Sequence, residues 1–86
     1  MPQPRLWVDE ICEALAALGG QASLDEIYSK IEQRGLMDFE ANPNWEAAVR
    51  RTIQQHSSDT EIFTGRPEDD IFTAPLGKGA GVWALR

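Results

Sequence analysis

Residues 42–59 read NPNWEAAVRRTIQQHSSD, and the spacing of their side chains is that of a central helix with two unlike faces. Asn42 and Pro43 predict its start, because Asn caps a first turn well and Pro fits the first helical position. Apolar residues then recur at helical intervals, and we expect the helix to end at residues 57–59. The apolar face comprises Trp45, Val49, Ile53 and His56, flanked by Ala48 and Thr52.

Two further amphipathic helices are expected before this one. Residues 6–18 predict the first, and the glycines at 19–20 can adopt the left-handed backbone that ends a helix. Ser23 opens the second, since Ser23 and Glu26 have the spacing of a capping box, and Gly35 is a suitable stop. The apolar positions are Trp7, Ile11, Ala14, Leu15 and Leu18 in the first helix, and Leu24, Ile27, Tyr28 and Ile31 in the second.

The rest of the chain changes to a β-type pattern. Short runs of this kind lie within residues 61–64 and 70–73, and the turn-rich residues 65–69 separate them. Residues 74–81, APLGKGAG, predict a flexible loop before a closing strand at 82–85. The second run and the closing strand are expected to pair as a hairpin around that loop.

Three helices followed by a hairpin with a long tip is the order of the winged helix, a variant of the helix-turn-helix fold. The sequence therefore predicts an α+β fold, with residues 1–86 as a single winged-helix domain. In such folds the third helix normally enters the major groove of DNA, and we expect the wing to contact the duplex beside it.

The net charge of −6 argues against a general nucleic-acid binder, because such proteins are usually basic. The charge is unevenly distributed along the chain. Residues 1–42 carry three basic and eight acidic side chains, whereas residues 43–86 carry five basic and six acidic side chains. If the protein binds DNA, we expect contact through the second half and a weak sequence-independent affinity.

The sequence lacks the residues that several classes of function require. Because Cys12 is the single cysteine and His56 the single histidine, the chain predicts neither an internal disulfide nor a zinc site. No catalytic constellation is present in the sequence, so we expect a binding domain without metal or cofactor rather than an enzyme. No apolar run approaches the roughly 20 residues of a membrane span, and residues 1–7 lack signal-peptide features. We expect a cytoplasmic protein with no membrane partner.

Spaced motifs along nearly the whole chain carry a family resemblance. They are Trp7, Ala14-Leu15, Leu18-Gly19-Gly20, Leu24, Glu26-Ile27-Tyr28, Asn44-Trp45-Glu46, Arg50, Ile53, His56-Ser57-Ser58-Asp59, Phe72, Gly79 and Gly81-Val82-Trp83-Ala84-Leu85-Arg86. With these residues the chain resembles the HARE-type winged helix-turn-helix domains of restriction endonucleases and some chromatin proteins, and is most similar to bacterial versions fused to HNH-type nucleases. The resemblance implies a double-stranded DNA-binding module whose nuclease activity lies on a covalently linked domain. Because some restriction enzymes sense N6-methyladenine through similar winged-helix modules, a reader of methylated DNA is a more specific version of this DNA-binding hypothesis.

Arg50 and Arg51 are the leading candidates for DNA contact, since Arg suits both phosphate and the guanine edge. They point about 100° apart on a helix, and we expect Arg51 to face DNA. Arg50 is expected to pack toward a neighbouring helix or a phosphate, and an Arg50–Glu46 pair within the helix is the alternative. The base-edge candidates are Asn44, Ala47, Gln54 and Gln55, each of which can also be ordinary helix surface.

Five further residues complete the expected DNA-binding set. Trp45 could line a pocket for a methyl group, although its place on the apolar face favours core packing. Ser57 and Ser58 follow the third helix and could bond phosphate. Lys78 and Gly79 stand at the expected wing tip, where Lys can reach a phosphate and Gly allows close approach, unless this is simply a flexible hairpin end.

The alternative function is a protein-interaction module. Many winged helices bind proteins, and the net charge of −6 suits that role better than DNA binding. The acidic first helix, with Glu10 and Glu13, would then provide the binding surface.

Overall fold

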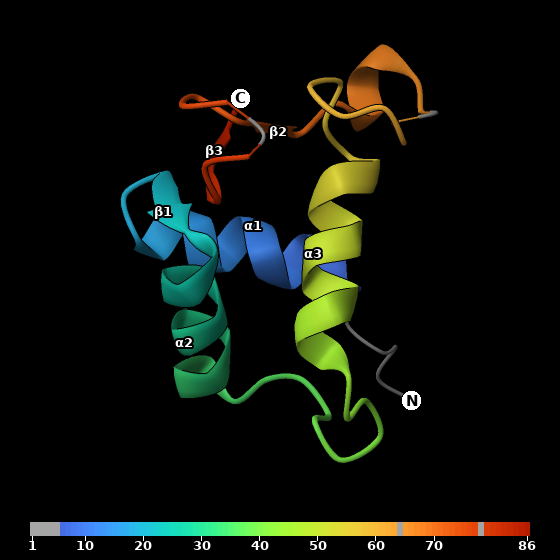
Figure 1. The fold of residues 1–86 in the computed structure, drawn as a ribbon. Helices are drawn as coiled ribbons and strands as arrows, with labels where there is room; N and C mark the ends of the chain where they lie inside the picture. Colours follow the sequence, from blue (N-terminus) through green and yellow to red (C-terminus); the bar gives the residue numbers. More distant parts are fainter. Residues whose placement is uncertain (1–5, 64, 78) are drawn as a thin grey trace.

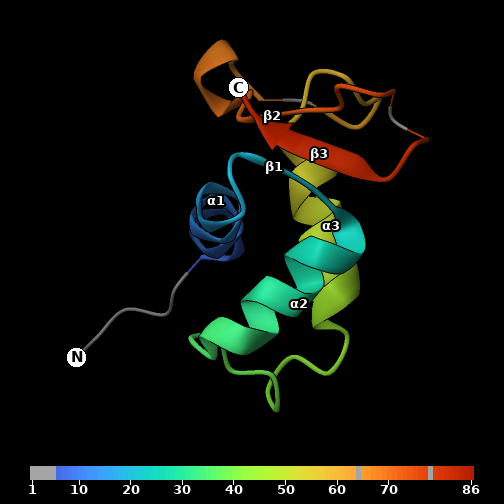
Figure 2. The ribbon, with the colours of Figure 1, turned by 90° about the vertical axis from the view of Figure 1, so that its left-hand side faces the viewer.

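The computed structural model describes residues 6–63, 65–77 and 79–86. Its elements are α1 (Trp7–Ala17), β1 (Gln21–Ser23), α2 (Leu24–Arg34), α3 (Trp45–Gln55), the 3-10 turn η1 (Pro67–Asp69), β2 (Phe72–Thr73) and β3 (Val82–Leu85). These residues form three α-helices and a three-stranded antiparallel sheet, so the expected α+β class is confirmed (Figure 1). The sheet lies at one end of the helical part, and α1 runs across α2 and α3 (Figures 1 and 2). No helix in the described ranges is both long and apolar enough to cross a membrane.

The sheet joins the two halves of the chain. Its strand order is β1-β3-β2, and β3 is antiparallel to both neighbours. The expected β2–β3 hairpin is confirmed, with Thr73 opposite Ala84. The sequence does not predict β1, whose three residues directly precede α2 and place Ala22 opposite Trp83. A segment this short has no periodicity of its own, and β3 supplies its hydrogen-bond partners.

The capping box at the start of α2 forms as expected. Ser23 Oγ accepts a hydrogen bond from the backbone N–H of Glu26 (3.2 Å), and Glu26 Oε1 accepts one from the Ser23 N–H (3.0 Å). The backbone donor of Ser23 favours the ionised carboxylate and lowers the pKa of Glu26 below its ordinary value. Gly35 caps the other end with φ +62°, so both predicted ends of α2 are confirmed.

The start of α3 differs from the expectation. The helix begins at Trp45, and Asn44 rather than Asn42 is the residue at its N-cap. Asn42 belongs instead to the preceding turn, where its side-chain amide donates to the Asp38 carbonyl (2.9 Å) and its carbonyl accepts from the Trp45 N–H (3.0 Å). Pro43 therefore precedes the helix, and the prediction of Asn42 as the cap was wrong.

The strand expected at residues 61–64 is also absent from the part of this run that the structure describes, residues 61–63. Two hydrogen bonds of Thr60 turn the chain back at this point. Its hydroxyl donates to the Gln54 carbonyl (2.6 Å) and to the Ser57 carbonyl (3.0 Å). Ile62 is exposed as a result, and the apolar pair at 62–63 was a misleading indication of a strand.

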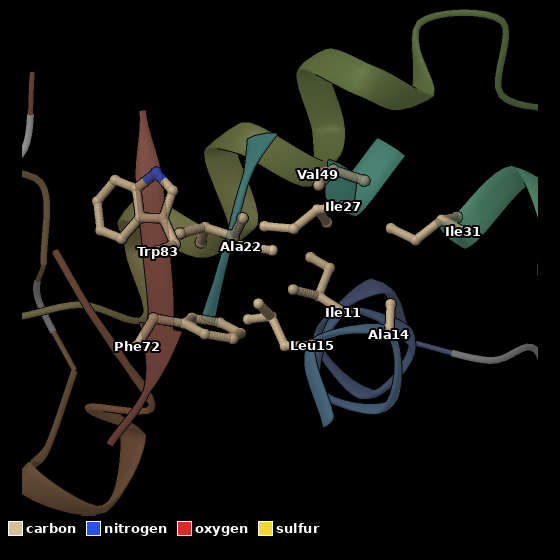
Figure 3. Packing of buried hydrophobic residues seen from close by; sticks show 10 residues of the cluster. Ile11, Ala14, Leu15, Ala22, Ile27, Ile31, Val49, Phe72 and Trp83 are labelled. Carbon is tan, nitrogen blue, oxygen red and sulfur yellow. The ribbon is translucent and has the colours of Figure 1, made fainter. Parts of the chain in front are cut away.

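The core lies where α1, α2, α3 and the sheet meet. Ile11, Leu15 and Phe72 are fully buried, and the Phe72 ring reaches from β2 toward Leu15 of α1 (Figure 3). The remaining buried core residues are Ala14, Ala22, Ile27, Ile31, Val49, Ile53 and Trp83. Every helix and strand contributes to this cluster, which explains why α3 holds a fixed position relative to the hairpin.

An aromatic cluster covers the α3 N-terminus at the other end of the core. The Trp45 ring is stacked on Trp7 of α1, with centroids 6.2 Å apart and an interplanar angle of 8°. Tyr28 of α2 meets the same indole edge-on at 5.8 Å, and Phe39 meets it at 5.0 Å. Trp45 therefore connects α3 to α1, to α2 and to the loop between α2 and α3.

One acidic residue of α1 is buried, contrary to its expected exposure. Glu10 has no exposed surface, and its Oε2 lies 2.7 Å from Nε of Arg34, the last residue of α2. Nη2 of the same guanidinium lies 2.7 Å from Oε1 of Glu13. Helix α1 therefore uses these two carboxylates to bind α2, and Glu10 is not part of an accessible acidic surface.

Candidate nucleic-acid interface

One flank of α3 faces away from the rest of the fold. Val49 and Ile53 bury the opposite side of the helix, and no other described helix covers this flank (Figure 1). Side chains on this flank line a shallow, open depression of about 450 Å³. We call its lining the α3 face, which consists of Asn44, Ala47, Ala48, Arg51 and Thr52. Three of the expected site residues, Asn44, Ala47 and Arg51, thus come together.

The composition of the α3 face suits contact with a base-pair edge. Thr52 turns its hydroxyl inward and donates to the Ala48 carbonyl (2.7 Å), so the floor offers mainly methyl groups. Arg51 and Asn44 provide the hydrogen-bonding groups beside this floor. Arg pairs well with guanine, Asn with adenine, and small apolar side chains with a base methyl group.

Arg50 and Arg51 are both exposed on α3. Neither guanidinium has a hydrogen bond or an ion pair with any residue in the described ranges, so the alternative Arg50–Glu46 pair is absent there. Arg50 does not line the depression that contains Arg51, in keeping with their different directions on the helix. Its exposure does not favour the expected packing toward a neighbouring helix and leaves it available to a phosphate.

The structure disperses the other expected residues of α3. Trp45 is half-buried in the aromatic cluster, as the core-packing interpretation implies. Gln55 is exposed, whereas Gln54 is half-buried and lies on a separate depression of about 220 Å³ that Trp83 also lines. Trp83 is only 2% exposed, so its ring offers no open surface for stacking.

The two serines after α3 are poorly placed to bind phosphate. Ser57 is fully buried, so its position does not favour the predicted contact with DNA. Ser58 is exposed, but its Oγ donates to Asp70 Oδ2 (2.6 Å) and accepts from Arg86 Nη2 (3.1 Å). Its hydroxyl therefore has internal partners on both the donor and the acceptor side.

These bonds belong to what we call the Arg86 network, which consists of Ser58, Asp59, Asp70 and Arg86. Arg86 Nε lies 2.9 Å from Asp70 Oδ1, and Nη2 lies 3.2 Å from Asp59 Oδ1. The network joins the turn after α3 to both sides of the hairpin. Sequence reasoning missed it because the partners lie 12 to 28 positions apart and have no common spacing.

Internal hydrogen bonds lower the pKa of both carboxyl groups of the Arg86 network below their ordinary 3.8. Hydrogen bonds from the Ala74 backbone and the Thr73 hydroxyl are the main cause at Asp59, ahead of the charge of Arg86. The hydroxyl and backbone N–H of Ser58 are the main cause at Asp70. Because folding lowers both pKa values, the stability they provide is complete above about pH 4 and is lost as the pH falls through the folded-state values.

We therefore expect acid to weaken the fold through this network. The free energy of unfolding should decline below about pH 4, and the decline should be shallower in an Asp59→Asn, Asp70→Asn double variant, which has no carboxylates to protonate there. Urea unfolding followed by circular dichroism between about pH 7 and pH 2.5 measures both slopes. Equal slopes for the two proteins would contradict a role of the network in acid stability.

The expected wing lies between β2 and β3. Gly79 is exposed, and Gly77 and Gly81 have φ values of +94° and +73°, which only Gly adopts without strain. Lys78 lies outside the described residues. Successive turns shape the loop, because Gly77 N–H donates to the Ala74 carbonyl and Ala80 N–H donates to the Gly77 carbonyl, each at 3.1 Å.

The described residues contain no group of three or more His, Cys, Asp or Glu side chains placed to hold a metal ion. No family model, curated protein or solved structure matches this chain, and the resemblance noted from its motifs remains an expectation.

Proposed function

We propose that this chain is a winged-helix module that binds double-stranded DNA, with α3 in the major groove and the β2–β3 loop as the wing. The observation that carries the proposal is the α3 face, where Arg51 and Asn44 border a floor of small side chains on an uncovered helix flank. The exposed Arg51 guanidinium has no partner among the described residues and is therefore available to a guanine edge or a phosphate.

The order of elements supports the same proposal. The chain runs helix, strand, helix, helix, strand, strand, with a loop between the last two strands. A short strand after the first helix completes the sheet of a winged helix, and in that fold the third helix enters the major groove. The net charge of −6 implies weak sequence-independent binding, so base contacts by the α3 face would provide much of the affinity.

The proposal extends to the setting of the module. We suggest a restriction endonuclease whose nuclease activity lies on a linked domain, and a target with a modified base such as N6-methyladenine. The methyl-lined floor formed by Ala47, Ala48 and Thr52 is the part of the α3 face that a base methyl group would contact.

The acidic surface of α1 that a protein-interaction module would use is smaller than the sequence suggests. Glu10 is fully buried, and Arg34 binds both Glu10 and Glu13, so replacing these carboxylates would disturb the α1–α2 contact. The net charge remains the observation in its favour. A loss of partner binding in such variants would therefore need a stability control.

A fluorescence-anisotropy titration at low salt tests the proposal directly. Matched duplexes would be unmodified, N6-methyladenine-containing or 5-methylcytosine-containing. We expect salt-sensitive binding of the wild-type protein, and a loss of about 5- to 150-fold in Arg51→Ala, the equivalent of about 1–3 kcal/mol for one Arg contact. Tighter binding to one modified duplex would identify the module as a modification reader.

Lys30→Ala provides the matched control, because it removes the same charge from α2, where Lys30 Nζ contacts Gln33 Oε1 at 3.4 Å. Its affinity for DNA should stay close to that of the wild type. Absence of binding to every duplex above about 100 μM protein, the weak end of the usual non-specific range, would refute DNA binding. Equal losses in Arg51→Ala and Lys30→Ala would refute the α3 face as the contact.

A further inference from the structure

A single carboxylate joins the end of α3 to the start of the β2–β3 loop. Asp59 lies in the turn after α3, and its Oδ2 accepts hydrogen bonds from Thr73 Oγ1 and from the Ala74 N–H, each at 2.8 Å. Its Oδ1 lies 3.2 Å from Nη2 of Arg86, which follows β3. From the turn after α3, Asp59 therefore contacts the start of the loop and the residue that follows β3.

In the described ranges, another hydrogen bond ties this loop to the rest of the fold: at its far end the Gly81 carbonyl accepts from the Leu24 N–H (2.9 Å). Among the described residues, its two turns are built in succession on Ala74, which is the residue that Asp59 holds. Leu76 is 66% exposed, and Gly77 and Gly79 are exposed as well, so the core does not hold the tip. The anchor at Ala74 sets where both turns begin relative to α3.

We infer that Asp59 is a positioning residue for DNA binding, which holds the β2–β3 loop beside α3 so that both elements contact one duplex. This inference rests on the proposed function. A loop that is already in place loses less conformational freedom on binding than one that must be ordered by the ligand. Asp59 itself does not contact DNA.

The sign of the effect separates positioning from simple electrostatics. A carboxylate near a DNA-binding surface repels phosphate, so its removal should tighten binding if charge alone matters. The positioning role predicts the opposite result. The variant Asp59→Ala should bind DNA more weakly by about 2- to 12-fold for each side chain that then has to be ordered. The dependence of affinity on salt should also decrease, by about 0.9 in slope for each phosphate that the loop no longer reaches.

Two further variants complete the test. Thr73→Val removes one hydrogen bond to Asp59 without a change in charge, and it should weaken binding in the same direction. Glu68→Gln removes one negative charge from η1, where Glu68 contacts only the exposed Arg66 at 3.8 Å among described residues, and it should bind DNA as well as or better than the wild type.

Anisotropy titrations at several salt concentrations would be combined with ¹⁵N relaxation of residues 74–81 in the free protein. We expect faster motion of the loop in Asp59→Ala and in Thr73→Val. If the wild-type protein binds DNA and both Asp59→Ala and Thr73→Val bind it equally well or more tightly, this inference is overturned but the proposed function is not. If the wild-type protein binds no duplex, the proposed function and this inference fall together. Should Asp59→Ala fail to fold, the milder Thr73→Val decides the question by the same criteria.

Discussion

Replacement of Phe72 by Ala should destabilise the protein by about 3–5 kcal/mol, the usual cost of removing a buried Phe. Phe72 has no exposed surface and lies between α1 and the sheet, where its ring approaches Leu15 (Figure 3). The loss is large against a total stability of about 5–15 kcal/mol for a typical domain. Because each kcal/mol shifts the Tm of a domain this small by about 4–8 °C, a fall of more than 10 °C is expected.

Two controls make this result specific to the Phe72 site. Leu76→Ala removes an apolar side chain that is 66% exposed, and its effect should stay within about 0.5 kcal/mol. Phe72→Leu retains most of the volume and should cost less than about 1.5 kcal/mol. Urea unfolding followed by circular dichroism measures all three. A loss below about 1 kcal/mol for Phe72→Ala would contradict the packing between β2 and α1.

The second large effect is expected at Trp45. Its indole stacks on Trp7 and also meets Tyr28 and Phe39, so truncation to Ala removes the contacts that join α3 to three other segments. Since Trp45 is half-buried, we expect a cost of about 3 kcal/mol, at the lower end of the range for large aromatic residues. Each aromatic pair contributes about 0.5–1.5 kcal/mol beyond the area it buries.

Urea unfolding and DNA titration of the same variants separate a packing role of Trp45 from a DNA contact. Trp45→Phe preserves part of the stacking and should recover much of the stability and the DNA affinity. Arg50→Ala, an exposed position on the same helix, should change stability by no more than about 0.5 kcal/mol. If Trp45→Phe kept the wild-type stability but lost DNA affinity, Trp45 would be a base contact rather than a packing residue.

Local patterns predicted the helices well because their causes lie within a few residues. The capping box of Ser23 and Glu26 needs only two side chains at the correct spacing, and it forms in the structure. The start of α3 was placed too early because Asn42 bonds to Asp38, and a cap and a turn residue look alike in sequence. The Ile62-Phe63 run failed as a strand because the hydrogen bonds of Thr60 take the chain into a turn.

Only the part of the candidate site that lies on one helix was predictable from the sequence. Because Ala47 and Arg51 are four residues apart, their common face follows from the helical repeat. The burial of Ser57 and the internal bonds of Ser58 depend on segments that fold back from much later in the chain. No local pattern indicates such partners.

The sequence by itself therefore determined the three helices, the β2–β3 hairpin and the division of α3 into an apolar side and a polar side, since these follow from periodicity and local hydrogen bonding. Tertiary structure alone decided that β1 pairs with β3, that Glu10 is buried against Arg34 and that Asp59 accepts a hydrogen bond from the Ala74 N–H. Each of these contacts joins residues that are distant in the sequence. Burial and hydrogen bonding between such residues appear only once the helices and the sheet have packed together.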